Sequence, residues 1–403
     1  MSPRLSLLAA LTLGLPCAAY ELRHDSQGDV VAWQGHVDFV IDSKLAIQLD
    51  EPRTDGAIAA AIAVLDNATP TLVVRSHVAD ALPLGYRTDG SPNENGIVAI
   101  TEDWPYDEKA LAATVVTLNA RTNLILDADI AINAERHHFR VVDSMPSNEQ
   151  HGDVNDVQNT MTHELGHAVG LMHNADDPVV VMYPSAAPLE MSKRAYAQDD
   201  RAGLAALYSD SGVFVPDTKP VAIAGCSASG GGLTLIIAAV VLLFGTRRRH
   251  QEVVAVVAVL GAFAALADDA RLPQVSQVEH ATLATVVDRT TVRLPSNPGL
   301  FVTDLTLRVR DCVKGDCAAS GTMIVRVPGG RLGDLEQVVD HQPVPPLSST
   351  VLVTRERTAS RPHVVTVDEP RRAELRRQIE AAGQPVPGSL APQTSPPTRS
   401  PTR

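Results

Sequence analysis

The sequence HELGHAVGLMH occupies residues 163–173, and its spacing is that of a metal site. In a helix, His163 and His167 are four residues apart and lie on one face, so both rings can reach one ion. Gly170 can adopt a left-handed or otherwise unusual backbone that ends the helix, which lets His173 return as a third ligand. Three histidines leave the fourth position of a tetrahedral zinc ion open.

Glu164 follows the first of these histidines and should project beside the ion. Zinc lowers the pKa of a bound water to about 7, so a neighbouring carboxylate can take its proton and later return it to a leaving amine. A lone histidine is usually a structural residue, but the full spacing with its glycine rarely arises by chance. We therefore predict Glu164 as the general base and then the general acid. The predicted zinc ligands are His163, His167 and His173.

This segment, together with residues 181–184 (VMYP), resembles the zinc helix and Met-turn of the metzincin metallopeptidases, and specifically of the matrixins. The resemblance implies that Met182 forms a hydrophobic floor under the metal. Residues 198–208 resemble the matrixin C-terminal helix, and residues 123–133 the strand that borders the cleft. The resemblance spans about Trp33 to Tyr208. It implies an α/β domain with a mixed twisted sheet, an active-site helix and a C-terminal helix.

One departure from the family concerns latency. Animal matrixins keep themselves inactive with a propeptide cysteine that ligates the zinc. The only cysteine ahead of the zinc helix is Cys17, which lies in the predicted leader. The sequence therefore supports no cysteine switch, and any latency must come from another device.

The N-terminus has the layout of a secretory signal peptide. Arg4 precedes an apolar run from Leu5 to Leu15, and small residues follow before Tyr20. The run is too short to span a bilayer. We therefore predict a signal peptide over residues 1–19, rather than a buried helix, and an exported protein at the cell surface or outside the cell.

Charge is divided unevenly along the 403 residues, whose formal net charge is −13. Residues 20–219 hold 31 acidic and 13 basic side chains. This acidic part does not favour nucleic acid as a partner. Its carboxylates either serve solubility or supply structural calcium sites, as in many matrixins. The candidates for calcium are Asp89, Asn93, Asn95 and Asp127–Asp129.

Residues 20–212 are predicted to form the matrixin-like peptidase domain. Alternating and β-branched runs indicate strands, and an alanine-rich stretch with helical spacing indicates a helix. The predicted strands are 33–41, 72–78, 97–101, 113–119 and 124–133, with a turn at 121–123, and the predicted helix is 55–67. The zinc helix should be capped by Asp153 or Asn155. Its buried side should carry Val157, Met161 and Leu165.

The amino-acid composition of the chain changes after residue 212. Residues 213–232 predict a linker that contains Gly225-Cys226, and residues 233–249 predict an apolar anchor that ends in three arginines. This layout resembles the C-terminal sorting signal of exported myxobacterial surface proteins, which implies that Cys226 is the processing or attachment point. An ordinary membrane anchor, with its arginines on the cytoplasmic side, would look much the same.

A second apolar segment, residues 253–267, ends in Ala-Leu-Ala, a small-residue pattern like the cleavage site of a signal peptide. Either both apolar segments form a membrane hairpin, or two neighbouring reading frames are joined in one chain. Fifteen helical residues span about 22 Å, less than the ~30 Å hydrocarbon core, which favours the second reading slightly. Both readings place the tail outside the cytoplasm, and the membrane is the predicted partner of the apolar segments.

Residues 268–369 predict a small all-β domain, because Val, Thr and Leu alternate there, as in residues 305–310 and 323–327. Cys312 and Cys317 predict a disulfide that clips a hairpin. No catalytic set of residues is visible in this range. Residues 370–403 predict a charged helix followed by a disordered end.

The sequence therefore predicts a zinc-dependent endopeptidase whose substrate is an extended polypeptide. An alternative from another class is an exported binding or adhesion protein that retains the zinc site with little proteolysis and uses the β tail for adhesion. Glu164 argues against this alternative, because metal binding alone does not require that carboxylate.

Overall fold

The computed structural model describes residues 20–143, 154–209, 272–315, 321–340, 342–356, 361–381 and 390, which belong to one unit of the chain. The predicted signal peptide, the linker with Cys226 and both apolar segments lie outside the described residues. Within the described ranges, no helix is both long and apolar enough to cross a membrane.

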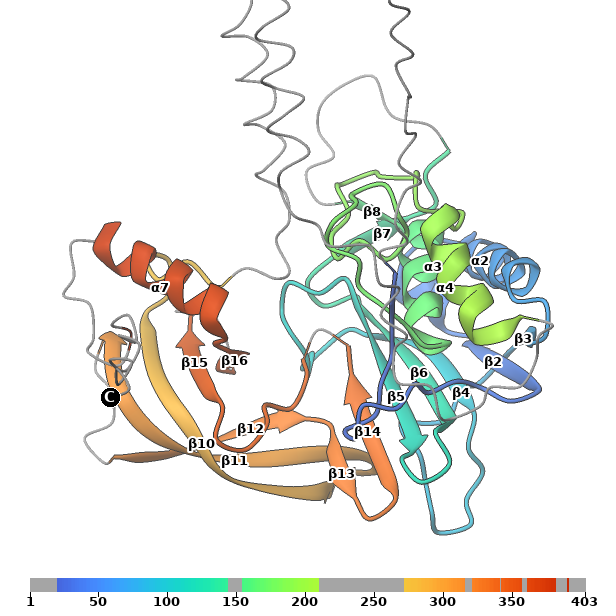
Figure 1. Ribbon diagram of the computed structural model, residues 1–403. Coiled ribbons are helices and arrows are strands. Elements are labelled where there is room, and N and C mark those ends of the chain that lie inside the picture. The colour runs from blue at the N-terminus through green and yellow to red at the C-terminus, as the bar shows by residue number, and fades with distance from the viewer. Residues whose placement is uncertain are drawn as a thin grey trace, which may run out of the picture. The chain divides into compact units, whose positions relative to one another are not determined.

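A seven-stranded mixed sheet underlies the predicted catalytic part (Figure 1). Its strands are β2 (His36–Asp42), β3 (Val73–Ala79), β4 (Asn95–Ile100), β5 (Ala112–Asn119), β6 (Leu124–Asn133), β13 (Gly330–Leu332) and β14 (Leu335–Val339). They lie in the order β3-β2-β4-β6-β5-β14-β13. Pairing is parallel from β3 to β6, and β5 is antiparallel to both its neighbours. The five strands predicted for this part are present as β2 to β6, with bounds that shift by up to three residues.

Helices pack against this sheet around one apolar core. They are α1 (Leu45–Gln48), α2 (Thr54–Ala68), α3 (Val157–Ala168) and α4 (Gln198–Tyr208). α2 packs against β3 and α3, and α3 packs against β5 and β6. The buried face of α2 carries Ala57, Ile58, Ala61, Ile62 and Leu65, and its small alanines let α3 approach closely. The predicted helix at 55–67 is therefore confirmed.

The C-terminal part forms a five-stranded antiparallel sheet in the order β12-β11-β10-β15-β16. Its strands are β10 (His280–Leu294), β11 (Asn297–Lys314), β12 (Thr322–Pro328), β15 (Thr350–Arg355) and β16 (His363–Thr366). Helix α7 (Glu369–Ala381) packs Leu375 and Ile379 against one end of it. Cys312 is disulfide-bonded, and Cys317 lies outside the described residues.

The strands of residues 268–369 are divided between two sheets, whereas the sequence predicts one small domain there. The hairpin of β13 and β14 leaves the five-stranded sheet and extends the seven-stranded one. Gln337 of β14 ties the two sheets together: its side chain donates to Thr117 (3.0 Å) and accepts from the Phe301 amide (2.7 Å). Alternation predicts a strand but not its partner, so the sequence gives no sign of this pairing.

Candidate metal centre

Helix α3 begins at Asp156, whose side chain accepts a hydrogen bond from the Asn159 amide at 2.8 Å. The cap predicted at Asn155 is wrong, because its side-chain amide instead donates to the His138 carbonyl; the alternative, Asp153, lies outside the described residues. The predicted buried side of the helix is confirmed. It consists of Val157, Met161 and Leu165, all at most 1% exposed.

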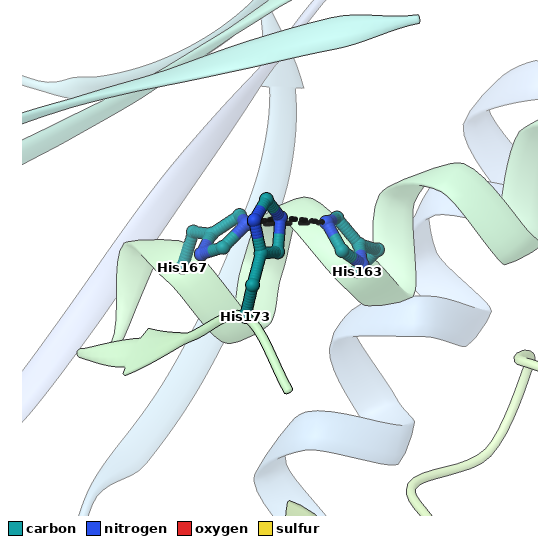
Figure 2. A group of neighbouring side chains, drawn as sticks. All are labelled: His163, His167 and His173. Atoms are coloured by element: carbon teal, nitrogen blue, oxygen red, sulfur yellow. Dashed lines mark hydrogen bonds between the residues drawn. The ribbon is translucent and has the colours of Figure 1, made fainter. Parts of the chain in front are cut away.

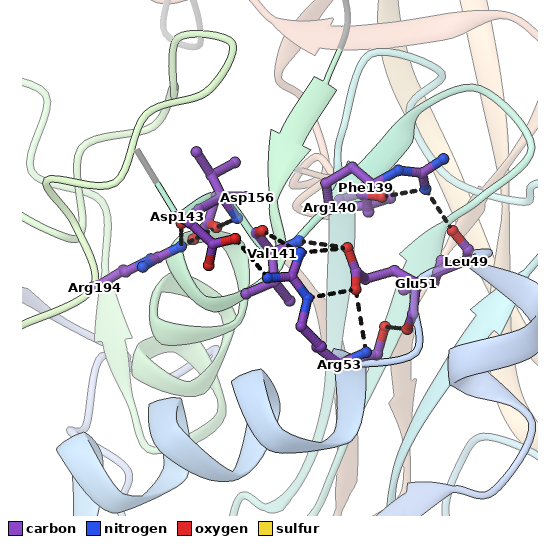
Figure 3. A network of polar contacts seen from close by, with 11 residues as sticks. Leu49, Glu51, Arg53, Phe139, Arg140, Val141, Asp143, Asp156 and Arg194 are labelled. Atoms are coloured by element: carbon purple, nitrogen blue, oxygen red, sulfur yellow. Dashed lines mark hydrogen bonds and ion pairs between the residues drawn. The ribbon is translucent and has the colours of Figure 1, made fainter. Parts of the chain in front are cut away.

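A network of charged groups holds this end of the helix (Figure 3). Asp156 accepts from the Val142 amide at 2.9 Å and forms an ion pair with Arg194. Next to it, Arg53 bridges Glu51 and Asp143. Hydrogen bonds from Arg53 lower the pKa of Glu51 to about 2, so this carboxylate stays ionised. The network fixes the start of α3 against residues 141–143.

The other end of α3 turns at Gly170, where φ is +103°. A Cβ at this position would lie 3.0 Å from the Val31 carbonyl oxygen, so both the conformation and the space require glycine. The chain then enters the short strand β9 (Leu171–Met172), which pairs with β1 (Glu21–Leu22) and leads directly to His173. The turn predicted at Gly170 is confirmed.

The rings of His163, His167 and His173 converge at their Nε2 atoms (Figure 2). The three Nε2–Nε2 distances are 3.0, 3.1 and 3.2 Å. Ligands ~2.0–2.1 Å from a tetrahedral zinc ion lie ~3.3 Å apart, so this donor set fits zinc. Within the described ranges, no other group of three or more His, Cys, Asp or Glu side chains could hold a metal ion.

Backbone carbonyls orient two of the rings. The Nδ1 atom of His163 lies 2.7 Å from the Val181 oxygen, and that of His167 lies 2.9 Å from the Leu171 oxygen. A carbonyl only accepts, so each Nδ1 carries the proton and donates it. The Nε2 atoms therefore present lone pairs to one another, an arrangement that suits a shared cation.

Glu164 lies on the same helix and is 3% exposed. The Thr114 hydroxyl, from β5, donates to its Oε2 at 2.6 Å and thereby fixes one carboxylate oxygen. His163 and Glu164 line a cleft of about 1140 Å³. Thr114 could not be singled out from the sequence, because threonine also occurs at Thr117 of the same strand.

Met182 packs directly against the zinc helix and is 2% exposed. A Cβ added to Gly166 would lie 2.4 Å from the Met182 sulfur, so the thioether occupies the space that this glycine leaves open. Gly166 lies between His163 and His167 in the chain. Met182 is therefore placed as an apolar support for the helical turn that carries both histidines.

Residues 94–209 match the family model described as Matrixin. The chain carries a matrixin-like metallopeptidase domain. The match includes the three histidines, Glu164 and Met182, and this family implies a catalytic zinc ion. It begins near the start of β4 and ends just after α4. No curated protein matches the chain.

Asp200 holds the Met-turn of the matrixin-like domain in place. Its carboxylate accepts from the amides of Val181 (2.9 Å), Met182 (3.1 Å) and Ala197 (2.8 Å). Burial raises the pKa of Asp200, and these three donors oppose the rise. Because the Val181 carbonyl orients His163, Asp200 acts on the metal centre through the turn. The sequence signal for this role is an acidic residue in the first turn of the C-terminal helix.

A buried ion pair lies behind His167. Arg23 contacts both carboxylate oxygens of Asp340 (2.6 and 2.8 Å) and donates to the His167 carbonyl (3.3 Å). Both charged side chains are 1% exposed, and Asp340 Oδ1 lies 3.8 Å from His167 Nδ1. Sequence reasoning missed this pair because its members are 317 residues apart.

The calcium candidates do not gather into one set. At the surface, Asp89 accepts a hydrogen bond from the Ser91 amide, and Asn93 accepts one from the Arg87 amide. The Asn95 side chain instead forms hydrogen bonds with the backbones of β2 and β6. Asp127 and Asp129 are both buried, and Asp129 accepts from the Gly96 amide at 2.7 Å. Calcium binding stays a prediction for this part of the domain.

The buried pair Asp127 and Asp129 should make stability depend on pH. Burial raises the pKa of Asp129 to about 6 and that of Asp127 well above the ordinary 3.8. The folded state therefore holds protons that the unfolded state has lost, so stability falls as pH rises from about 4 through about 6. Asp127→Asn should raise the free energy of unfolding at pH 7 by about 1–3 kcal/mol and flatten this dependence. Urea unfolding at pH 4 and pH 7 measures both effects; a less stable variant at pH 7 would instead indicate that the ionised pair binds a cation.

Proposed function

We propose that the chain is a zinc-dependent endopeptidase that cleaves extended polypeptides. Its ligands are His163, His167 and His173, and Glu164 is the general base and then the general acid. The observation that carries the proposal is the triangle of three Nε2 atoms, whose lone pairs converge beside a buried carboxylate. The matrixin match over residues 94–209 supports the same conclusion.

The residues around the cleft have different roles in the proposed hydrolysis of a peptide bond. A zinc ion held by the three histidines would acidify a water molecule and polarise the scissile carbonyl. Glu164 takes a proton from the attacking water and delivers it to the nitrogen of the departing amine. The Thr114 hydroxyl keeps this carboxylate in one orientation, so the transfer needs little rearrangement.

The surrounding groups keep the site ready for this reaction. Val181 and Leu171 carbonyls hold two imidazoles in the tautomer that leaves Nε2 unprotonated. Met182 supports the helix beneath them and excludes water from that side. These contacts place the donors before substrate arrives, which is what preorganised catalysis requires.

The enzyme is proposed to act outside the cytoplasm. The leader-like residues 1–19 support export, and the disulfide at Cys312 suits an oxidising compartment. The apolar segments 233–249 and 253–267 remain the predicted membrane contact, and Cys226 the predicted processing point.

Removal of the metal tests the proposed function. Full-length protein should cleave an unfolded protein substrate, and 1,10-phenanthroline should reduce the appearance of new amino termini to background. One equivalent of zinc should restore cleavage, because the site holds a single set of three donors. The non-chelating 1,7 isomer is the control. Cleavage that persists after all zinc has been removed would contradict a metallopeptidase.

A further inference from the structure

The outer edge of β5 is covered by a strand from the C-terminal part of the chain (Figure 1). β14 runs antiparallel to β5, with Leu335 opposite Asn119 and Val339 opposite Val115. The Asp340 amide continues the ladder and donates to the Thr114 carbonyl at 3.1 Å. β5 lies within the matrixin match, whereas residues 335–340 lie far beyond its end at residue 209.

The edge of β5 is the sheet edge beside the reacting groups. Thr114, on this strand, donates to the Glu164 carboxylate. An extended polypeptide binds most simply by adding a strand to such an edge, because its own amides and carbonyls then find partners. With β14 in place, the next strand outward would lie ~10 Å from β5, too far to bring its backbone to Glu164.

The residue after β14 is fixed behind His167. Asp340 pairs with Arg23 and lies 3.8 Å from Nδ1 of His167, the ring nitrogen that faces away from the three Nε2 atoms. Val339, before this residue, and Gln342, after it, line the same cleft as His163 and Glu164. Residues 335–340 therefore run extended along the sheet edge that borders this cleft, as a substrate would.

We propose that residues 335–340 form an internal inhibitory strand, which holds the position of an extended substrate and keeps the enzyme latent until it is displaced. The proposal rests on the proposed peptidase function. It supplies a device for latency where the sequence offers no cysteine switch. A strand tethered in the same chain competes at an effective concentration of roughly millimolar, so substrate at micromolar concentration cannot displace it easily.

A proline at Val338 would weaken this strand without touching the metal ligands. The ladder bonds of Asp340 to Thr114 and of Ala120 to Asp334 place Val338 opposite Val116 in a hydrogen-bonded pair, because such pairs alternate along an antiparallel ladder. Proline lacks the amide hydrogen needed there. Val338→Thr keeps the backbone bonds and the branched shape, so it is the matched control.

The experiment measures both binding and cleavage in the full-length proteins. A fluorescent extended peptide is titrated into the wild type, Val338→Pro and Val338→Thr, each with its zinc content and thermal unfolding recorded. We expect the proline variant to bind the peptide at least ~10-fold more tightly, with KM lower by the same factor and kcat little changed. A synthetic peptide of residues 334–340 should compete with the fluorescent peptide for this variant.

Each outcome decides a different point. A folded, zinc-loaded Val338→Pro protein that binds the peptide no better than the wild type would overturn the inhibitory strand. Tight binding without cleavage by any of the proteins would uphold the strand and reject the peptidase. If the proline variant does not fold, Val338→Gly takes its place: glycine weakens a strand without removing its amide hydrogen, and it should show a smaller gain in peptide affinity in the same direction.

Discussion

Replacing Glu164 by glutamine should lower kcat/KM for peptide hydrolysis by ~10²–10⁴-fold, the usual contribution of a general acid–base group. Glutamine has the same shape, and its amide oxygen can still accept the hydrogen bond from Thr114. It cannot take a proton from water at neutral pH. The loss should therefore appear in kcat, with zinc content and thermal unfolding close to those of the wild type.

The measurement needs a control carboxylate in the same cleft. Glu108 lines that cleft but pairs with Arg136, so Glu108→Gln should leave kcat within a few-fold of the wild type. Both variants are best compared in the Val338→Pro background as well, so that latency does not hide the effect. Equal hydrolysis by Glu164→Gln and the wild type, each containing zinc, would rule out the assigned role.

The candidate metal centre could be predicted from the sequence because its residues lie close together in the chain. His163, Glu164 and His167 share one helix, and a period of 3.6 residues fixes their relative directions. Gly170 then turns the chain within three residues, which brings back His173. The helix start was harder to predict, since several polar residues near 153–156 are acceptable caps and tertiary contacts select Asp156.

Contacts between residues that are far apart in the chain could not be predicted from the sequence. Thr114 and Glu164 meet because β5 packs over α3, and Arg23 and Asp340 meet because two distant segments converge behind His167. Apolar alternation identified strands such as β5 and β12, but it carries no information on which strands pair. A domain boundary drawn from composition therefore separated residues that the fold brings together at one sheet.

Asp200→Ala is expected to give the largest loss of stability, about 3 kcal/mol or more, and to weaken zinc binding ~10–100-fold. The substitution leaves the amides of Val181, Met182 and Ala197 buried without their acceptor, and each such group costs ~1–3 kcal/mol. The Met-turn would then shift, and with it the carbonyl that orients His163 and the sulfur that packs on Gly166.

Urea unfolding and competition with a zinc chelator measure the two effects of Asp200→Ala separately. Asp177→Ala is the matched control, because Asp177 lies in the same loop between His173 and Met182 and its carboxylate accepts from the exposed amide of Val179. It should cost less than about 1 kcal/mol and leave zinc affinity unchanged. An Asp200→Ala protein that unfolds more easily but binds zinc as the wild type does would show that the turn supports the fold alone. A parallel loss of both would mean that one buried carboxylate couples the C-terminal helix to the metal centre.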